Sequence, residues 1–283
     1  MAAAYLTLSE ALGIRAASVV ALIGGGGKTS TLVRLAQETA QDGHRVLATT
    51  TARMKLDELN DMRDVLLWDD RDVTGETWRS YRDEATTGSS TGWIDAFLEG
   101  QRPPSRIPVS FLGRSVMRDK VVGLPSEYLG QLLSRLNWDV VVVEADGSRG
   151  RSIKGHRLGE PVLPLCATHC VIVVGADGFE LPLNEESCHR PEVIQDLVGV
   201  AWGERLDPRA IATLITHPKG VLTKIPGDME VVVYVNKAPI GEQAQAARFA
   251  QEILRRAGRR IQRVAVGDNL QGGLVETFLA EGD

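Results

Sequence analysis

Four consecutive glycines followed by a lysine and two hydroxyl residues are the part of this sequence with the most readable chemistry. Residues 19–30 read VVALIGGGGKTS, so an apolar run typical of a buried strand ends at the glycines, and helical spacing begins after Lys28. Strand, glycine turn and helix in this order predict a phosphate-binding loop. Because glycines let backbone amides curl around phosphate oxygens, we expect this segment to bind a nucleotide. The expected nucleotide-binding residues are Gly24, Gly25, Gly26, Gly27, Lys28, Thr29 and Ser30.

The spacing of these glycines differs from the commonest phosphate-binding loop. The pattern G-x-x-x-x-G-K-[ST] would place a glycine where this chain has Leu22, and the shorter form Gly24-x-x-Gly27-Lys28-Thr29 is present instead. The shorter loop resembles that of ATP-dependent Mur-type ligases. We expect Lys28 to reach the terminal phosphates and the Thr29 hydroxyl to ligate Mg²⁺. The alternative is a glycine-rich turn whose lysine faces solvent.

A second apolar run leads directly into carboxylates. Residues 140–151 read VVVVEADGSRGR, and a carboxylate where a parallel strand ends can hold Mg²⁺, directly or through water, or polarise a nucleophile. Alternation along the strand puts Glu144 and Asp146 on one side, so both are candidate metal ligands and, with Lys28, candidate catalytic residues. Ser148, Arg149 and Lys154 follow, with Arg151, where an anionic substrate could bind.

Two other polar segments could contact substrate. Thr50, Thr51 and Arg53 follow the short strand predicted over residues 45–48, on the ligand side of a parallel sheet. Threonine is also common in strands whether or not it contacts a ligand. His189 and Arg190 lie in the polar stretch NEESCHRPE, although a single histidine is more often structural.

The segment Asn236-Lys237-Ala238-Pro239 is similar to the N-K-x-D motif of GTP-binding proteins. Pro239 replaces the aspartate that binds guanine and cannot make those bonds, so guanine selectivity is not expected. Asn236 and Lys237 are still expected to border the base.

Composition limits the class of protein. The chain has 283 residues, 43% of them hydrophobic, and a formal net charge of −5, which argues against a dedicated nucleic-acid binder. No apolar run approaches the length of a membrane span, and the first residues do not resemble a secretory signal. Three cysteines, an odd number, suit a reducing cytoplasm. The spacing of Cys166, His169 and Cys170 matches no common zinc pattern, and whether these thiols and Cys188 bind metal or selenium stays open.

Strands alternate with helices along the chain. This order predicts an α/β fold with a mainly parallel, doubly wound sheet of the P-loop nucleoside triphosphatase type. We expect one domain over residues 1–283, with an insertion or lid at 57–118 that could instead hold a strand pair at 65–68 and 109–112. Residues 274–280 are expected to form a short helix on the sheet.

Five segments in this order, GGGGKTS, TTTARM, EADGSRGRSIK, NEESCHRPE and NKAP, resemble the selenium-dependent hydroxylase accessory protein family (YqeC). The resemblance implies a P-loop protein that assists maturation of molybdenum-containing hydroxylases through selenium or cofactor delivery. The implied partners are a molybdenum hydroxylase or a selenium or cofactor carrier. By matching motif, Gly24, Gly27, Lys28 and Thr29 would hold phosphate and Mg²⁺, Glu144 and Asp146 would sit at the metal, and Arg149, His189 and Arg190 would contact substrate or a regulator.

The expected reaction is Mg²⁺-dependent hydrolysis of ATP or GTP, or phosphoryl transfer from it. Two alternatives belong to other classes. One is an ATP-dependent ligase that activates a carboxylate, and the other is a nucleotide-gated metallochaperone or binding module with little turnover.

Overall fold

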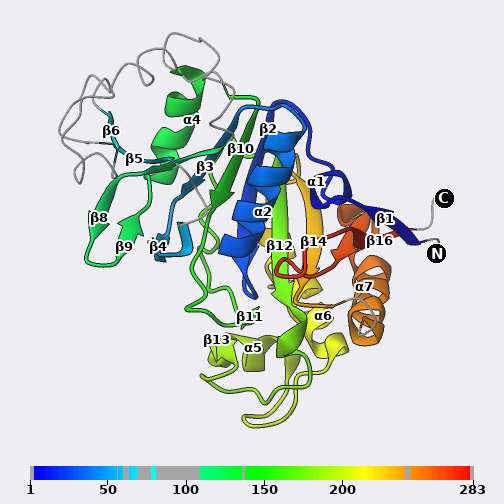
Figure 1. Ribbon diagram of the computed structural model, residues 1–283. Helices are drawn as coiled ribbons and strands as arrows, with labels where there is room; N and C mark the ends of the chain where they lie inside the picture. The colour runs from blue at the N-terminus through cyan, green and yellow to red at the C-terminus, as the bar shows by residue number, and fades with distance from the viewer. Residues whose placement is uncertain are drawn as a thin grey trace.

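The computed structural model describes residues 3–55, 57–59, 64–68, 78–80, 109–135, 138–239 and 243–280. Within these ranges, eleven strands form one sheet (Figure 1). From one edge to the other the strands are β1 (Ala3–Leu6), β16 (Val275–Leu279), β15 (Arg263–Val266), β14 (Glu230–Asn236), β12 (His169–Gly175), β2 (Ser18–Gly24), β10 (Val140–Glu144), β3 (Val46–Thr50), β7 (Val109–Gly113), β5 (Asp64–Trp68) and β6 (Trp78–Ser80).

All neighbouring pairs from β15 to β5 are parallel, and only β1, β16 and β6 at the edges run antiparallel to their neighbours. The predicted α/β class with a mainly parallel sheet is therefore confirmed. The candidate strand pair is also present, since β5 and β7 pair in parallel as part of the main sheet. The rest of the predicted insertion lies largely outside the described residues.

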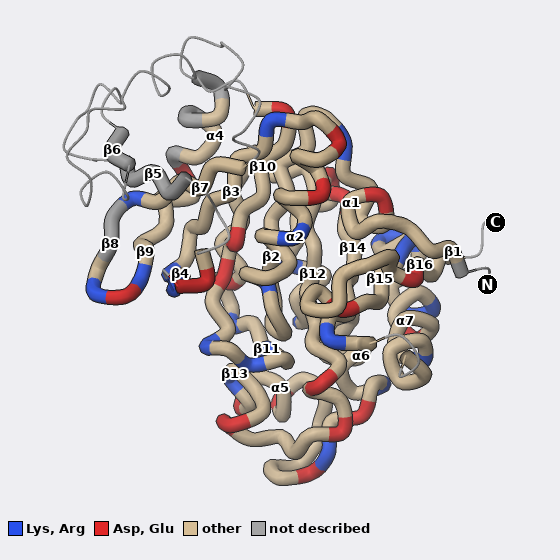
Figure 2. The backbone as a smooth tube through the Cα atoms, viewed as in Figure 1, with Lys and Arg blue, Asp and Glu red and all other residues tan. Residues whose placement is uncertain are grey.

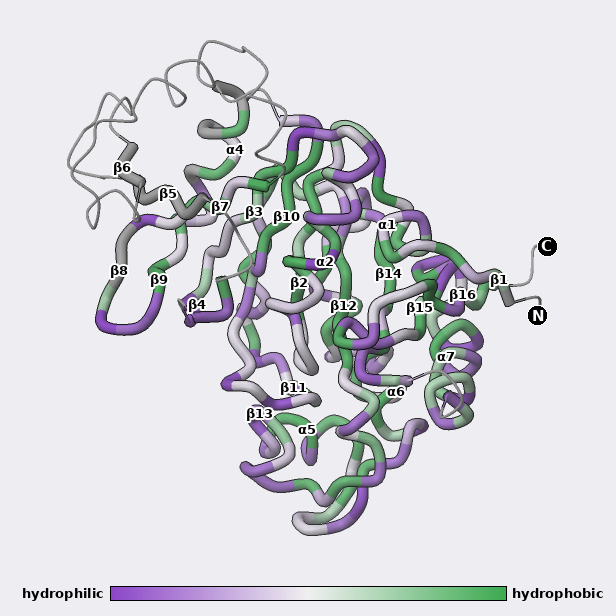
Figure 3. Tube along the Cα trace, viewed as in Figure 1, coloured by the Kyte–Doolittle hydropathy of each residue, from purple (hydrophilic) through white to green (hydrophobic). Residues whose placement is uncertain are grey.

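Helices cover both faces of the sheet. The residues Val20 and Leu22 of β2 point toward α1 (Leu8–Ala11) and α2 (Lys28–Gln41), and share one buried cluster with them. Ala21 and Ile23 point the opposite way and share a cluster with α5 (Pro191–Val198), α6 (Pro208–Thr216) and α7 (Ala244–Ala257). Figure 3 shows the hydrophobic strands between the helices. Since both faces are covered, the central strands are apolar without alternation, as parallel strands usually are.

On the side of β3 and β10, α4 (Ser126–Arg135) closes a smaller cluster around Leu129 and Val143. Two small sheets lie outside the main one. β4 (Arg53–Lys55), β9 (Lys120–Val122) and β8 (Ser115–Met117) form an antiparallel sheet, and β11 (Ile153–Lys154) pairs in parallel with β13 (Cys188–His189).

The predicted helix at residues 274–280 is wrong. The segment is the strand β16, which pairs antiparallel with β1 on one side and β15 on the other, with Val264 opposite Phe278. Its sequence VETFL carries β-branched and aromatic residues that suit a strand. The edges of β1 and β15 supply backbone hydrogen-bond partners to β16, and these edges would stay unpaired if the segment were a short helix.

No helix in the described ranges is long and apolar enough to cross a membrane.

Candidate functional site

The four glycines form the whole connection between β2, which ends at Gly24, and α2, which begins at Lys28. Gly24, Gly26 and Gly27 have φ angles of 97°, 79° and 106°, a region that side chains disfavour. Space also requires glycine, because a Cβ on Gly24 would lie 2.3 Å from the Val173 carbonyl oxygen, and one on Gly26 would lie 2.1 Å from the Gly175 nitrogen. The loop is therefore packed directly against the carboxyl end of β12.

The backbone amides of this loop fall into two groups. Those of the first three glycines already donate within the protein, to Asp146 Oδ2 at 3.1 Å, to the Val173 oxygen at 2.9 Å and to the Arg151 oxygen at 3.0 Å. The amides of residues 27–30 find no acceptor in the described part of the chain. They open the first turn of α2, where amides and the helix dipole favour an anion.

Residues 27–30 line an open cavity of about 790 Å³, within the size range of small-molecule sites. Its other walls are the outer face of α2, the β4 segment, the turn at residues 147–150 and the loop at 269–273. We call this space the loop cavity. The predicted residues Arg53, Glu144, Ser148, Arg149 and Lys237 also line it.

Glu144 is the last residue of β10 and lies opposite Leu22 of β2 and Thr50 of β3. The Thr29 hydroxyl donates to Glu144 Oε2 at 2.8 Å. Burial raises the pKa of Glu144 to about 7, although the Lys28 ammonium and the Thr29 hydrogen bond act in the opposite direction. A hydroxyl and a carboxylate side by side are hard oxygen donors, so this pair is suited to Mg²⁺.

Asp146, two residues further, has a different environment. Its Oδ2 accepts from Lys154 Nζ at 2.7 Å and from the Gly24 amide, and lies 2.9 Å from His156 Nε2. Lys28 Nζ lies 3.3 Å from Oδ1 and donates to the Gly24 oxygen at 2.7 Å. Although burial would raise the pKa of Asp146, Lys28, His156 and Lys154 together hold that pKa well below its usual range. Asp146 is thus an ionised anchor for the glycine loop.

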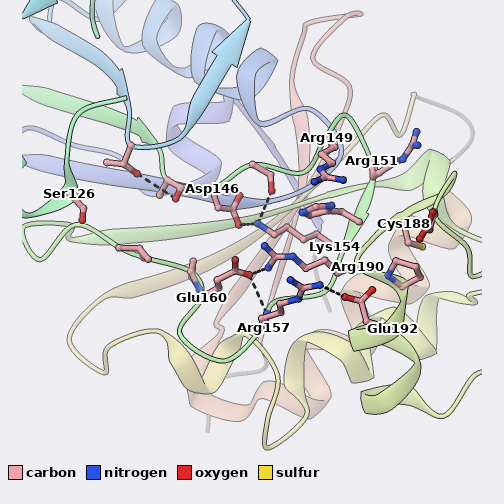
Figure 4. Close-up of a pocket in the computed structure, with 18 of the residues that line it drawn as sticks. Ser126, Asp146, Arg149, Arg151, Lys154, Arg157, Glu160, Cys188, Arg190 and Glu192 are labelled. Atoms are coloured by element: carbon pink, nitrogen blue, oxygen red, sulfur yellow. Dashed lines mark hydrogen bonds and ion pairs between the residues drawn. The ribbon is translucent and has the colours of Figure 1, made fainter. Parts of the chain in front are cut away.

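A second cavity of about 870 Å³, here called the arginine cavity, lies next to the first. The pairing of β11 with β13 brings Lys154 opposite His189 and so joins two segments that are far apart in sequence. Figure 2 shows Lys and Arg gathered around these two strands, and Figure 4 shows the cavity. Among the predicted residues, Thr51, Asp146, Arg149, Lys154, His189 and Arg190 line it.

Some predicted residues line neither large cavity. Thr50 is fully buried, and its hydroxyl donates to the Glu144 backbone oxygen at 2.9 Å, so it ties β3 to β10. Asn236 is also buried, and its Nδ2 donates to the Gly26 oxygen at 2.8 Å. Lys237 differs from these two residues, because it does line the loop cavity, where its Nζ also donates to Asp177 Oδ2 at 2.8 Å.

The sequence interpretation did not include His156 or Asn269. His156 contacts Asp146 after a turn, and Asn269 Nδ2 donates to Ser30 Oγ and Thr31 Oγ1 at 3.1 and 2.9 Å while its amide donates to Asn236 Oδ1. Nothing in the local pattern of either residue indicates this role. For Asn269, the one signal in the sequence is its position just after the carboxyl end of β15.

The three cysteines are unpaired, and no group of three or more His, Cys, Asp or Glu side chains in the described ranges is arranged to hold a metal ion. Cys170 and Cys188 are buried, and Cys166 is half-buried. Burial raises the pKa of the Cys170 thiol far above its usual value and that of Cys188 to about 11.

Comparison with known proteins gives three findings. The sequence model of the family described as "YqeC protein" matches residues 20–192. The "Uncharacterized protein YqeC" of Escherichia coli (strain K12) is 26% identical over 238 residues, which cover 81% of this chain and 79% of that protein. The crystal structure of FtsY from Mycoplasma mycoides aligns with a TM-score of 0.37 and 12% identity over 94% of this chain, which spans 64% of the FtsY chain. A likeness that weak defines neither fold nor function.

The anchoring role of Asp146 predicts a large loss of stability in Asp146→Asn. Removing the charge leaves two buried lysines without their counter-ion, so the free energy of unfolding should fall by about 3 kcal/mol or more. Urea unfolding without nucleotide or magnesium measures this. The matched control is Asp177→Asn, whose partly exposed pair with Lys237 should cost less than about 1 kcal/mol. Equal losses in both variants would contradict the anchoring role.

The raised thiol pKa values predict slow alkylation. At pH 8 in the native state, iodoacetamide should modify Cys166 first and leave Cys170 and Cys188 intact, because few of those buried thiols are ionised. Mass spectrometry of the digested chain measures each site, and all three should react in urea. Rapid native modification of Cys188 would indicate an accessible thiolate there.

Proposed function

The chain belongs to the YqeC protein family, and we propose that it binds a nucleoside triphosphate with Mg²⁺ in the loop cavity and hydrolyses it or transfers its γ-phosphoryl group. One observation carries the proposal. The amides of residues 27–30, without acceptors in the described part of the chain, open into a cavity that Lys28 and Thr29 also line. Anions bind at such helix starts because several amides and the helix dipole act together.

Each residue of the loop has a role in this proposal. The amides of residues 27–30 would bind the phosphate oxygens, and the Lys28 ammonium would exchange its contact with the Gly24 oxygen for the terminal phosphates. Thr29 and Glu144 would hold Mg²⁺, which supplies positive charge to the phosphate oxygens during transfer. Asp146 keeps the loop in place, because its Oδ2 contacts the Gly24 amide together with Lys154 and His156.

The base would lie against the loop at residues 269–273 and Lys237, which line the same cavity beyond the helix start. Pro239 has no side-chain acceptor for guanine, so we assign no preference between ATP and GTP. Asn236 does not itself line the cavity. It holds the wall in place by donating to the Gly26 oxygen and accepting from the Asn269 amide.

The biological role that we propose is the one implied by the family resemblance: assistance in the maturation of selenium-dependent molybdenum hydroxylases. The segments EADGSRGRSIK and NEESCHRPE, which carry that resemblance most specifically, meet in the arginine cavity through β11 and β13. Their meeting beside the loop cavity supports a role that couples nucleotide binding to a second ligand.

The proposed reaction predicts that Lys28→Ala lowers Mg²⁺-dependent hydrolysis of ATP or GTP by at least about 100-fold, because one positive charge at the terminal phosphates is lost. Phosphate release measures it, and chelation of Mg²⁺ should abolish the activity of the unaltered chain. Asp146 keeps Lys154 and His156 in this variant, so the fold should persist by circular dichroism.

The matched control is Lys219→Ala, an exposed lysine that lines neither cavity. Hydrolysis by Lys219→Ala should equal that of the unaltered chain. Full activity in a folded Lys28→Ala protein would end the catalytic proposal.

The proposed role predicts a phenotype. A host that makes a selenium-dependent molybdenum hydroxylase and lacks this chain should lose most of that hydroxylase activity. Reintroducing the unaltered chain or Lys219→Ala should restore it, whereas Lys28→Ala should not. Restoration by Lys28→Ala at equal expression would separate the role from nucleotide turnover.

A further inference from the structure

The arginine cavity has basic side chains from four segments around one space. Arg149 comes from the turn after β10, Lys154 from β11, Arg157 from the following loop and Arg190 from the start of α5. Figure 4 shows these side chains beside one another. A cavity of about 870 Å³ with this lining can take a whole small molecule.

The acidic residues of this cavity do not cancel its charge. Asp146 is neutralised by Lys28 and Lys154, Glu192 accepts from Arg157 at 2.6 Å, and Glu160 pairs with Arg190. Arg149 and Arg151, which also lines the cavity, have no side-chain partner among the residues that the structure describes. The two remaining acids, Glu127 and Glu185, are exposed. The lining therefore carries two unmatched guanidinium groups, those of Arg149 and Arg151, in addition to the paired ones of Arg157 and Arg190.

Donor groups remain available at this wall. The buried Lys154 ammonium has three N–H groups, of which two donate, to Asp146 Oδ2 at 2.7 Å and to the Gly147 oxygen at 2.8 Å. Burial, with Lys154 and Arg149 nearby, lowers the pKa of His189 to about 4, so its imidazole is neutral at pH 7 and presents one donor and one acceptor.

The backbone at this wall is also unusual. Arg149 and Arg190 have φ angles of 53° and 61°, a conformation that residues with side chains rarely adopt. Such residues gather at ligand sites, where the surrounding fold imposes the conformation.

The two cavities are neighbours. Gly147 and Arg149 line both of them. Lys28, which lines the loop cavity, lies 3.3 Å from Asp146, which lines the arginine cavity. A molecule in the arginine cavity would therefore lie beside the terminal phosphates of a nucleotide in the loop cavity.

We propose that the arginine cavity binds a second substrate, a small molecule that carries a phosphate or carboxylate group, at the same time as the nucleotide. Guanidinium groups bind both anions through paired hydrogen bonds, and the unpaired Arg149, in the same lining as Arg190 and Arg157, offers that contact. This inference rests on the proposed function, because the second substrate is defined by its place beside the nucleotide.

The test is calorimetric titration of the full chain saturated with Mg²⁺ and a non-hydrolysable imidotriphosphate nucleotide, so that the γ-phosphate position is filled. Inorganic phosphate and citrate are the two probes. One of them should bind saturably at one site, and Arg190→Gln and Arg149→Gln should each weaken it by at least about tenfold, or 1.4 kcal/mol. Saturation by phosphate alone assigns a phosphate-bearing substrate, and saturation by citrate alone assigns a carboxylate.

Lys219→Gln carries the same change in charge away from both cavities and should bind the anion as the unaltered chain does. Thermal unfolding checks that each variant is folded. If Arg190→Gln does not fold, the test rests on Arg149→Gln, because Arg149 is exposed and its substitution should not disturb the fold. The inference is overturned if neither anion binds saturably while the nucleotide does, or if folded variants bind as tightly as the unaltered chain.

A different result concerns the proposed function. If the nucleotide does not bind, the titrations are repeated without it. If an anion then binds saturably and Arg190→Gln removes that binding, the arginine cavity is an anion site. The nucleotide proposal and the role of this anion as a second substrate would both be contradicted.

Discussion

The buried carboxylate of Asp146 is the contact on which the site depends. It joins the Gly24 amide, the Lys28 and Lys154 ammonium groups and the His156 imidazole, which come from β2, α2, β11 and the chain just after β11. A buried anion without such partners would be costly, and without the anion the ammonium groups of Lys28 and Lys154 would repel each other. The glycine loop and the arginine cavity are consequently fixed by the same charge, which couples their geometries.

Glu144 and Asp146, at the end of one strand, have different roles because their partners differ. Glu144 accepts one hydrogen bond, from the Thr29 hydroxyl, and borders the loop cavity, so it has oxygen lone pairs for a cation. Asp146 instead faces protein groups: three of them contact Oδ2, and the Lys28 ammonium lies 3.3 Å from Oδ1. The same logic separates the loop amides, since three are used to hold the turn and those of residues 27–30 face the cavity. Structure and ligand binding are thus served by different members of one short motif.

Local pattern was enough to predict the strand, the glycine turn and the helix at residues 19–42, because apolar runs and glycine act through nearest neighbours. It also located Glu144 at the end of β10. It could not show that Asn236 braces Gly26, because that bond joins residues 210 positions apart in the chain. Nor could it show that β16 is a strand, because its partners β1 and β15 are supplied by the tertiary fold. The pairing of β11 with β13, which builds the arginine cavity, has the same tertiary origin.

The central claim is that the start of α2 binds a polyphosphate, and a crystal structure with Mg²⁺ and a non-hydrolysable triphosphate tests it most directly. The account predicts phosphate oxygens on the amides of residues 27–30, Mg²⁺ held by Thr29 and Glu144, and Lys28 Nζ moved from the Gly24 oxygen to the terminal phosphate. An empty helix start, with Lys28 still bound to Gly24 and Asp146 at saturating ligand, would contradict it.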